Sequence, residues 1–250
     1  SNDLNYRVLW AKSSPRHPLW KHSLDAAAVS LEMGSPVTDC GWDDAHVAML
    51  VGMHDIGKAD SSFQHRNSPG FSAELIEAGF PKTADAQCRH ERLSASFIRK
   101  KLLDDGLDRR LARTVSTCLL AHHGYWDTES RPVASAYQHA QNSILKELRG
   151  LIPFTSFPLD MPQDLSAFGI RIAGHIVLCD WIASNEAFIS DPRLAGLDEP
   201  GTYLDKAREV ACEWIDRLGF RTKRAVTPGK PHSIVSHPRP VQQFLLDQSL

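Results

Sequence analysis

Apolar residues recur along most of this chain at steps of three and four, which is the spacing of one face of an α-helix. Strict alternation of apolar and polar residues, typical of half-buried strands, is rare. The pattern therefore predicts an all-α fold with a helical body throughout. Helices are expected at about residues 19–33, 43–58, 86–103, 108–123, 134–148, 165–188 and 203–218.

Several predicted helices have recognisable ends. Residues 34–36, Gly-Ser-Pro, stop the first helix, Asp43 starts the second, and Gly106 separates the third from the fourth. Residues 61–82 contain glycines and prolines and are interpreted as loop-rich, with a short helical piece at about 73–78. The stretch 165–188 is apolar nearly all round, so we expect it to be the central helix of the domain.

Length and composition limit the class of protein. With 250 residues, 42% of them hydrophobic, the chain can build one large globular domain or two small ones. Its five cysteines lie far apart and form no C-x-x-C pair, which indicates reduced, mostly buried thiols in a cytoplasmic protein and excludes a zinc finger. No run approaches the roughly 18 to 20 uninterrupted apolar residues of a membrane span, so no membrane partner is expected.

The formal net charge of -2 argues against a surface that is cationic throughout, so any contact with a polyanion must come from local patches or from metal. Basic side chains outnumber acidic ones in residues 89–113. This stretch is either a solvated helix face or a guide for a nucleic acid backbone. Residues 221–250, rich in proline and basic residues, are interpreted as a linker that follows a domain at 1–220.

Candidate chemistry lies in histidines and aspartates on separate predicted helices. The candidates are His22, His54, Asp55, His90, His122, His123 and Asp180, with Lys58 close behind the His-Asp pair. Imidazole and carboxylate together are the ligand set of a transition-metal hydrolase, because both can be unprotonated at neutral pH. The remaining histidines, His17 and His175 among them, have no comparable pairing.

Each candidate taken alone has an ordinary explanation. A single histidine is usually a satisfied core or surface group, and Asp180 is equally explained by solvent or by a hydrogen bond to another helix. The joint pattern favours a metal site. Seven candidate ligands are too many for one ion and suit two divalent ions that share Asp55. Such a centre keeps a net positive charge, which favours a phosphate ester as substrate.

On these residues the chain resembles the HD superfamily of metal-dependent phosphohydrolases and, more closely, the HD nuclease domain of the type I CRISPR-associated helicase-nuclease. The matching strings are His54-Asp55-Ile56-Gly57-Lys58 with Phe63-Gln64, Ala121-His122-His123-Gly124 and Asp180-Trp181-Ile182-Ala183-Ser184-Asn185. The resemblance spans about residues 15–190. It implies an HD-domain-like helical bundle with a dinuclear metal site in its core.

The resemblance also implies the roles of individual residues. One ion is bound by His22, His54, Asp55 and Asp180, and the second by Asp55, His90, His122 and His123. Asp55 and Lys58 are the catalytic residues, and Lys58 also binds the substrate phosphate. A histidine-rich site favours Mn, Fe, Co, Ni or Zn, and nucleases often accept Mg as well.

The function implied by the resemblance is hydrolysis of single-stranded DNA, by nicking and by exonucleolytic degradation, in CRISPR interference. The implied partners are an RNA-guided CRISPR surveillance complex and a helicase domain, in the same longer protein or as a separate chain. Residues 238–243, Pro-Arg-Pro-Val-Gln-Gln, resemble the segment that opens that helicase part. Two alternatives stay open: an HD phosphohydrolase acting on nucleotides or cyclic dinucleotides, and a non-catalytic docking domain for the surveillance complex.

Overall fold

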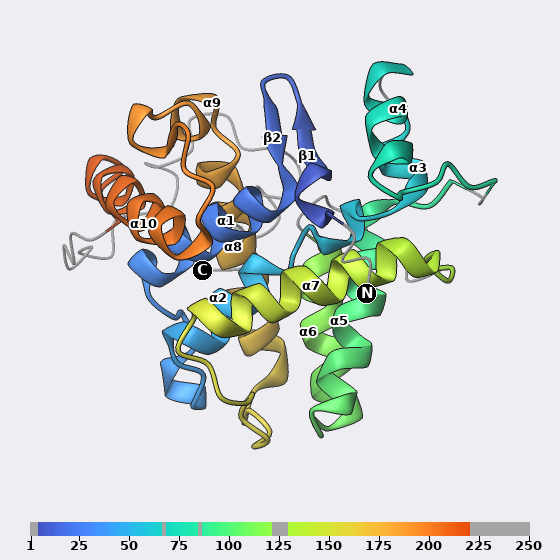
Figure 1. Cartoon of the computed structure of the whole chain (residues 1–250). Helices are drawn as coiled ribbons and strands as arrows, with labels where there is room; N and C mark the ends of the chain where they lie inside the picture. The colour runs from blue at the N-terminus through green and yellow to red at the C-terminus, as the bar shows by residue number, and fades with distance from the viewer. Residues whose placement is uncertain (1–4, 67–68, 85–86, 122–129, 221–250) are drawn as a thin grey trace, which may run out of the picture.

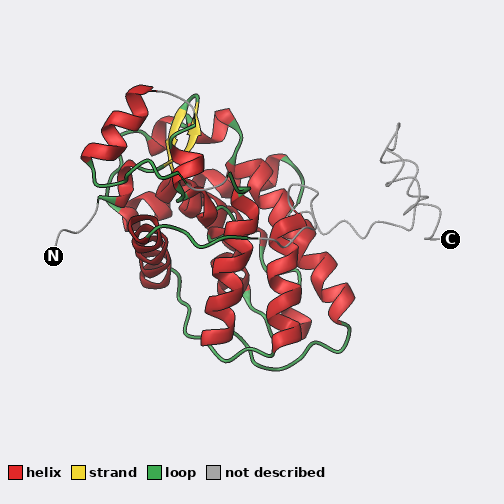
Figure 2. Ribbon diagram, turned by 90° about the vertical axis from the view of Figure 1, so that its right-hand side faces the viewer, coloured by secondary structure: helices red, strands yellow, loops and turns green. Residues whose placement is uncertain are grey.

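The structure is a computed structural model, and it describes residues 5–66, 69–84, 87–121 and 130–220. Its elements are η1 (Tyr6–Val8), β1 (Trp10–Ser13), β2 (Arg16–Pro18), α1 (Leu19–Met33), η2 (Thr38–Cys40), α2 (Asp44–Gly52), η3 (Ile56–Lys58), α3 (Ser61–Gln64), α4 (Pro69–Glu77), α5 (His90–Asp104), α6 (Arg109–Ala121), α7 (Ser135–Leu151), α8 (Leu165–Ala183), α9 (Glu186–Ile189), η4 (Pro192–Leu194) and α10 (Pro200–Arg217). Helices dominate the described chain, as Figure 2 shows, which confirms the predicted all-α fold.

Helix α1 is the central helix. It packs against α10, α2 and α8, and most of its side chains from Leu19 to Ser30 are buried. Residues 26–28 are alanines, and because their side chains are small, neighbouring helices can approach this stretch of α1 closely. Because helices surround it, α1 presents His22 to the core from a rigid support.

The prediction that residues 165–188 form the central helix is wrong. Helix α8 ends at Ala183, and α9 follows as a separate element. One side of α8 packs against α1 and α6, whereas on its open side Ile170 is 74% exposed and Trp181 is 67% exposed. By length and composition alone α8 could cross a membrane, a test that core helices also pass. Apolar residues all round a helix therefore did not identify the most buried one.

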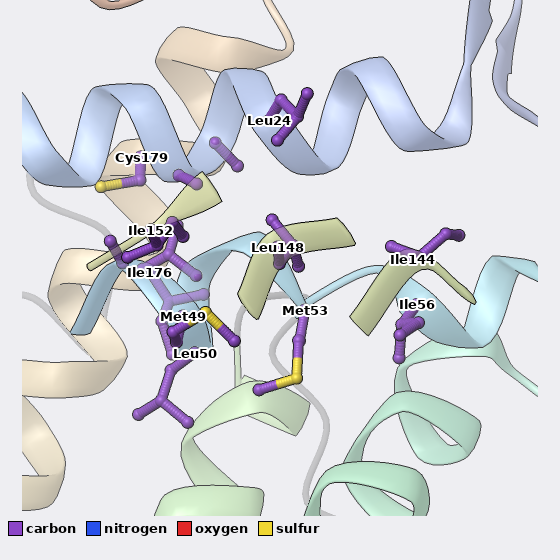
Figure 3. Packing of buried hydrophobic residues seen from close by; sticks show 14 of the residues in the cluster. Leu24, Met49, Leu50, Met53, Ile56, Ile144, Leu148, Ile152, Ile176 and Cys179 are labelled. Atoms are coloured by element: carbon purple, nitrogen blue, oxygen red, sulfur yellow. The ribbon is translucent and has the colours of Figure 1, made fainter. Parts of the chain in front are cut away.

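The hydrophobic core fills the space where α1, α2, α7 and α8 meet. Figure 3 shows Leu24 of α1, Met49 of α2, Leu148 of α7 and Ile176 of α8 in one cluster. These side chains are almost completely buried. Burying each one contributes about 1.5–3 kcal/mol relative to leaving it in water. This packing fixes α2 against α1, and it thereby fixes the start of the turn that carries the His-Asp pair.

A short antiparallel hairpin of β1 and β2 precedes α1, with Lys12 opposite His17. Figure 1 shows it between α9 and α4 at the top of the molecule. The sequence pattern did not predict it, because strands of four and three residues are too short for alternation to be recognised. The hairpin matters for the site because it supplies both Lys12 and His17.

Helix α2 ends at Gly52, so the His-Asp pair does not lie on its last turn as predicted. Beyond Gly52 the backbone tightens: the N–H of His54 donates to the carbonyl of Val51, and the N–H of Lys58 donates to the carbonyl of Asp55. Helix α5 lies against this turn. A Cβ at Gly57 would lie 2.0 Å from the carbonyl oxygen of His90, so only glycine permits the contact.

Two other predicted boundaries differ. Helix α5 begins at His90 and not near residue 86, and residues 61–82 contain both α3 and α4 where one short helical piece was expected. The side chain of Asp60 caps α3 by accepting from the N–H of Ser62 at 2.9 Å. Pro69 is the first residue of α4, where a missing N–H costs nothing. A proline treated as a helix breaker is therefore a helix start.

Candidate metal centre

Four predicted ligands lie together in the core. His22 comes from α1, His54 and Asp55 from the turn before η3, and Asp180 from the last turn of α8. One ligand atom of each residue lies within 4.8 Å of the others. Both histidines are fully buried, and Asp55 is 3% exposed. Residues far apart in the sequence thus form one polar cluster inside an apolar core.

The carboxylate of Asp55 lies between histidines. Its Oδ2 is 3.1 Å from Nε2 of His22 and 3.5 Å from Nε2 of His54, whereas its Oδ1 is 3.2 Å from Nε2 of His90. The two oxygens therefore face different histidines. A carboxylate placed in this way can bridge two ions.

Asp180 closes the other side of the cluster. Its Oδ1 lies 3.3 Å from Nε2 of His54 and accepts a hydrogen bond from the hydroxyl of Ser184 at 2.8 Å. The carbonyl of Ser184 accepts a hydrogen bond from Lys12 of β1. Sequence reasoning gave Lys12 and Ser184 no role. Ser184 had a signal, since it lies four residues after Asp180 in a helix, but nothing near Lys12 in sequence pointed to the site.

The two buried histidines are oriented differently. Nδ1 of His54 lies 2.7 Å from the carbonyl of Val51, and because a carbonyl only accepts, this nitrogen carries the proton. Nε2 of His54 is then the nitrogen that faces the two carboxylates, 3.3 Å from Oδ1 of Asp180, and it is the atom through which a neutral His54 would bind a metal ion. Nδ1 of His22 is buried and has no hydrogen-bond partner among the described residues.

A second buried polar cluster lies behind His22. Nε2 of His17 is 2.6 Å from Oδ2 of Asp25, and the hydroxyl of Tyr203 donates to Oδ1 of Asp25 at 2.9 Å. The rings of His17 and His22 meet edge to face with centroids 6.3 Å apart. The sequence analysis gave His17 no partner and overlooked Asp25. The available signal was the three-residue spacing of His22 and Asp25 on one helix face.

Charged and titratable groups surround both carboxylates. Lys58 lies closest to Asp55, with Nζ 2.5 Å from Oδ2. Burial lowers the pKa of His22. For His54 burial acts in the same direction, but the negative charges of Asp55 and Asp180 outweigh it and raise the pKa. Burial would raise the pKa of Asp180, yet the hydrogen bond and charge of His54 hold it well below its usual value. The two carboxylates are therefore the anionic groups of the cluster to which a cation would bind.

The second predicted ligand set is only partly described. His90 is the first residue of α5, and its Nδ1 lies 3.4 Å from Oε2 of Glu91. The structure thus brings His90 to Asp55 as predicted. His122 and His123 lie outside the described residues.

The basic residues between 89 and 113 lie before α5, on α5 and on α6, and Arg92, Arg99 and Lys100 line one hollow. Arg89 pairs with Glu91, Arg99 is exposed on α5, and Arg110 lies at the N-terminal end of α6. Their predicted role as a guide for a nucleic acid backbone stays a prediction. The five cysteines are free thiols, as expected, but Cys118 and Cys179 alone are buried.

The chain is similar to known proteins in sequence and in fold. A sequence model of the family described as "Cas3, HD domain" matches residues 10–189. The chain is 32% identical over 242 residues to the CRISPR-associated endonuclease/helicase Cas3 of Thermus thermophilus. That match covers 85% of this chain and 25% of the relative, so the chain spans about a quarter of the relative's length.

Solved structures resemble the fold. The crystal structure of the Thermus thermophilus Cas3 HD domain in the presence of Ni²⁺ is 28% identical with a TM-score of 0.59, covering 85% of this chain and 90% of that one. A chain in a CRISPR RNA-guided surveillance complex, described as pre-nicking, is 22% identical with a TM-score of 0.68, covering 86% of this chain and 29% of that one.

Proposed function

Because the chain belongs to the family of Cas3 HD domains, we propose that it is a metal-dependent nuclease that hydrolyses phosphodiester bonds of single-stranded DNA in CRISPR interference. Both endonucleolytic nicking and exonucleolytic degradation are part of this proposal. The observation that carries it is the position of Asp55, with one oxygen beside His22 and the other beside His90. Two cations on either side of one carboxylate are the usual arrangement for phosphodiester hydrolysis.

We propose two ligand sets for these cations. The first consists of His22, His54, Asp55 and Asp180, and the second of Asp55, His90, His122 and His123. The donor set suits divalent transition ions, because the hydrogen bond of His54 to Val51 turns Nε2 toward the two carboxylates, as a shared metal ion requires. Mn, Fe, Co, Ni and Zn fit this set best, and Mg is an acceptable substitute. The solved relative with Ni²⁺ supports a divalent ion.

The residues around the cluster have different proposed roles in phosphodiester hydrolysis. Ions held by these ligands would supply Lewis acidity at a phosphoryl group and would lower the pKa of a water molecule bound to them. Lys58 carries its ammonium beside Asp55 with 11% of its side chain exposed, so it can reach a non-bridging phosphate oxygen and neutralise its developing charge. Ser184 fixes the carboxylate of Asp180, and Lys12 fixes Ser184.

The proposed partners follow from the relatives. The chain matches a quarter of an endonuclease/helicase, which supports a helicase domain in the same longer protein or as a separate chain. The similar chain in a surveillance complex supports an RNA-guided complex as the partner that provides the DNA strand. We propose a cytoplasmic location on the same grounds.

Circular single-stranded DNA tests the proposal. With Mn²⁺ the 250-residue chain should first linearise the circle and then degrade it, and chelation with EDTA should stop both steps. Nucleotides and cyclic dinucleotides should remain intact under the same conditions. An intact circle together with hydrolysed dinucleotides would instead establish a small-molecule phosphohydrolase. An intact circle with no bound metal would establish a docking domain.

A further inference from the structure

A hollow of about 440 Å³ opens beside the metal centre. His90 and Glu91 line it at the start of α5, and its other walls come from α3, from Arg66 two residues after α3, and from the segment before α5. The lining residues are Ser62, Phe63, Arg66, Gln87, Cys88, Arg89, His90 and Glu91. Since Nε2 of His90 lies 3.2 Å from Asp55, a molecule in this hollow is in contact with the edge of the centre.

Phe63 connects the hollow with the catalytic lysine. Its ring meets the ring of His90 edge to face, with centroids 5.4 Å apart. Nζ of Lys58 lies 5.5 Å from the centroid of Phe63, and the guanidinium carbon of Arg66 lies 3.8 Å from the same centroid. The two cationic groups are therefore no farther apart than the sum of these distances. Adjacent phosphates of one nucleic acid strand fit between such a pair.

Arg66 differs from the other arginines nearby because it has no acidic partner among the described residues. Arg16 is paired with Glu74 at 2.7 Å, and Arg89 is paired with Glu91. The guanidinium of Arg66 instead lies on Phe63 and 5.9 Å from the ring centroid of Trp10. Partial burial lowers the pKa of Arg66, and no described carboxylate pairs with its charge.

The geometry points to Arg66 as a binding residue for a backbone phosphate of the strand, next to the phosphodiester that is cleaved. This inference rests on the proposed nuclease function and adds a binding site to it. A guanidinium held over an aromatic ring, as Arg66 is over Phe63, can still present N–H groups to two oxygens of a phosphate. The unbalanced charge of Arg66 is what an incoming phosphate would neutralise.

The experiment compares the 250-residue chain with Arg66→Gln, Arg66→Lys and Arg217→Gln. Arg217 is the matched control, because it is also exposed and its guanidinium carbon lies 5.5 Å from the ring centroid of Trp214, but it belongs to α10. Binding of a labelled oligothymidylate is measured by fluorescence anisotropy in EDTA at several salt concentrations. Thermal unfolding and metal affinity of each variant are measured in parallel.

We expect Arg66→Gln to weaken binding about tenfold, the effect of one charge-assisted hydrogen bond. It should also reduce the slope of log K against log salt by about 0.7, the value for one phosphate of a single strand. Arg66→Lys should keep the slope, since it keeps the charge. Arg217→Gln should match the unsubstituted chain. Unfolding temperature and metal affinity should be unchanged in all of them.

Two results would overturn the inference. One leaves the nuclease proposal intact, and the other contradicts that proposal as well. If the unsubstituted chain cuts DNA while Arg66→Gln binds with the same affinity and slope, Arg66 has no such role and the nuclease proposal stands. If the unsubstituted chain, loaded with metal, neither binds nor cuts the strand, both the nuclease proposal and the role of Arg66 fail.

Discussion

Asp55 is a buried carboxylate with positively charged or titratable side chains on several sides. It is 3% exposed, and a buried carboxylate is costly unless cations or hydrogen bonds compensate it. Lys58 provides one charge, and His22 and His90 face its two oxygens. A divalent ion on either side of Asp55 would compensate the carboxylate more completely. Asp55, which links the two proposed ligand sets, is thus also the residue whose buried charge bound cations would compensate most.

Asp55→Asn removes the charge and keeps the shape. We expect metal-dependent DNA cleavage to fall by more than the roughly 10–100-fold that changes outside the direct ligands cause, and bound metal measured by elemental analysis to decrease. Circular dichroism should show an intact helical fold. The control is Asp205→Asn on the exposed face of α10, which should leave cleavage unchanged. Full activity of Asp55→Asn in saturating metal would refute the role of Asp55.

At the residue scale, sequence reasoning identified those candidate ligands that an apolar helix face or a short sequence motif marks. His22 follows the apolar face of α1, and the His-Asp pair is adjacent in sequence, so both could be predicted. Lys12 and His17 could not be predicted, because they lie on a hairpin whose strand register cannot be recognised from the local sequence. Asp25 was missed because a buried carboxylate bonded to His17 and Tyr203 is visible only after folding.

The junction of η3 and α5 positions His54, Asp55 and His90 relative to one another. The N–H of Gly57 donates to the hydroxyl of Ser94 at 2.8 Å, and its Cα packs on the first turn of α5. A Cβ here would lie 2.0 Å from the carbonyl oxygen of His90 and 2.5 Å from the backbone nitrogen of Ser94. Neither atom can move without displacing the helix.

We therefore expect Gly57→Ala to reduce the free energy of unfolding by more than about 3 kcal/mol, measured by urea denaturation, because backbone atoms cannot relax as a side chain does. Bound metal should decrease as His90 moves away from Asp55. The matched control is Gly150→Ala in α7, where a Cβ meets no atom within 4 Å. That change should be neutral or stabilise by up to about 1 kcal/mol. Equal stability of the two variants would contradict the close contact.

The contact between α8 and α1 contains a buried histidine that responds to pH. His175 lies 2.9 Å from the hydroxyl of Ser30, and burial lowers its pKa to about 4. An unfolded histidine titrates near 6.5. Because the folded protein binds the proton less readily than the unfolded chain, stability from this group is complete above about pH 6.5. As the pH falls from about 6.5 toward 4, the free energy of unfolding decreases by roughly 3 kcal/mol in total through this group.

Urea denaturation between pH 7.5 and 4 checks this expectation. Between these two pH values, the free energy of unfolding of His175→Gln should fall by roughly 3 kcal/mol less than that of the unsubstituted chain. His139→Gln changes an exposed histidine of α7 and should leave the pH dependence as it is. A His175→Gln variant whose stability falls as steeply as that of the unsubstituted chain would show that His175 is not the responsible group.

At the element scale, long periodic helices were predicted well and short elements were not. Helix α1 has the predicted bounds, and Asp43 caps α2 as expected. The end of α2 was misplaced because the contact of Gly57 with α5 is a tertiary constraint. The central helix was misassigned for a related reason. Burial depends on what packs against a helix, and nothing described covers Ile170 or Trp181 of α8.

The whole molecule brings distant parts of the chain to one point. Figure 1 shows α1 with α2, α8 and α10 around it, and α5 and α6 together below the hairpin. Residue 22 and residue 180 meet only because α8 packs on α1 and ends beside the turn that follows α2. The fold class and most of one candidate ligand set could be predicted from helix periodicity. The connection between His90 and Asp55 was implied by family resemblance, because spacing alone cannot bring α5 to η3.

Anomalous scattering from crystals grown with Mn²⁺ or Ni²⁺ tests the central claim most directly. Data on either side of the absorption edge should give one peak enclosed by His22, His54, Asp55 and Asp180. A second peak should lie between Oδ1 of Asp55 and Nε2 of His90. Metal-loaded crystals in which those side chains contact no ion would contradict the account.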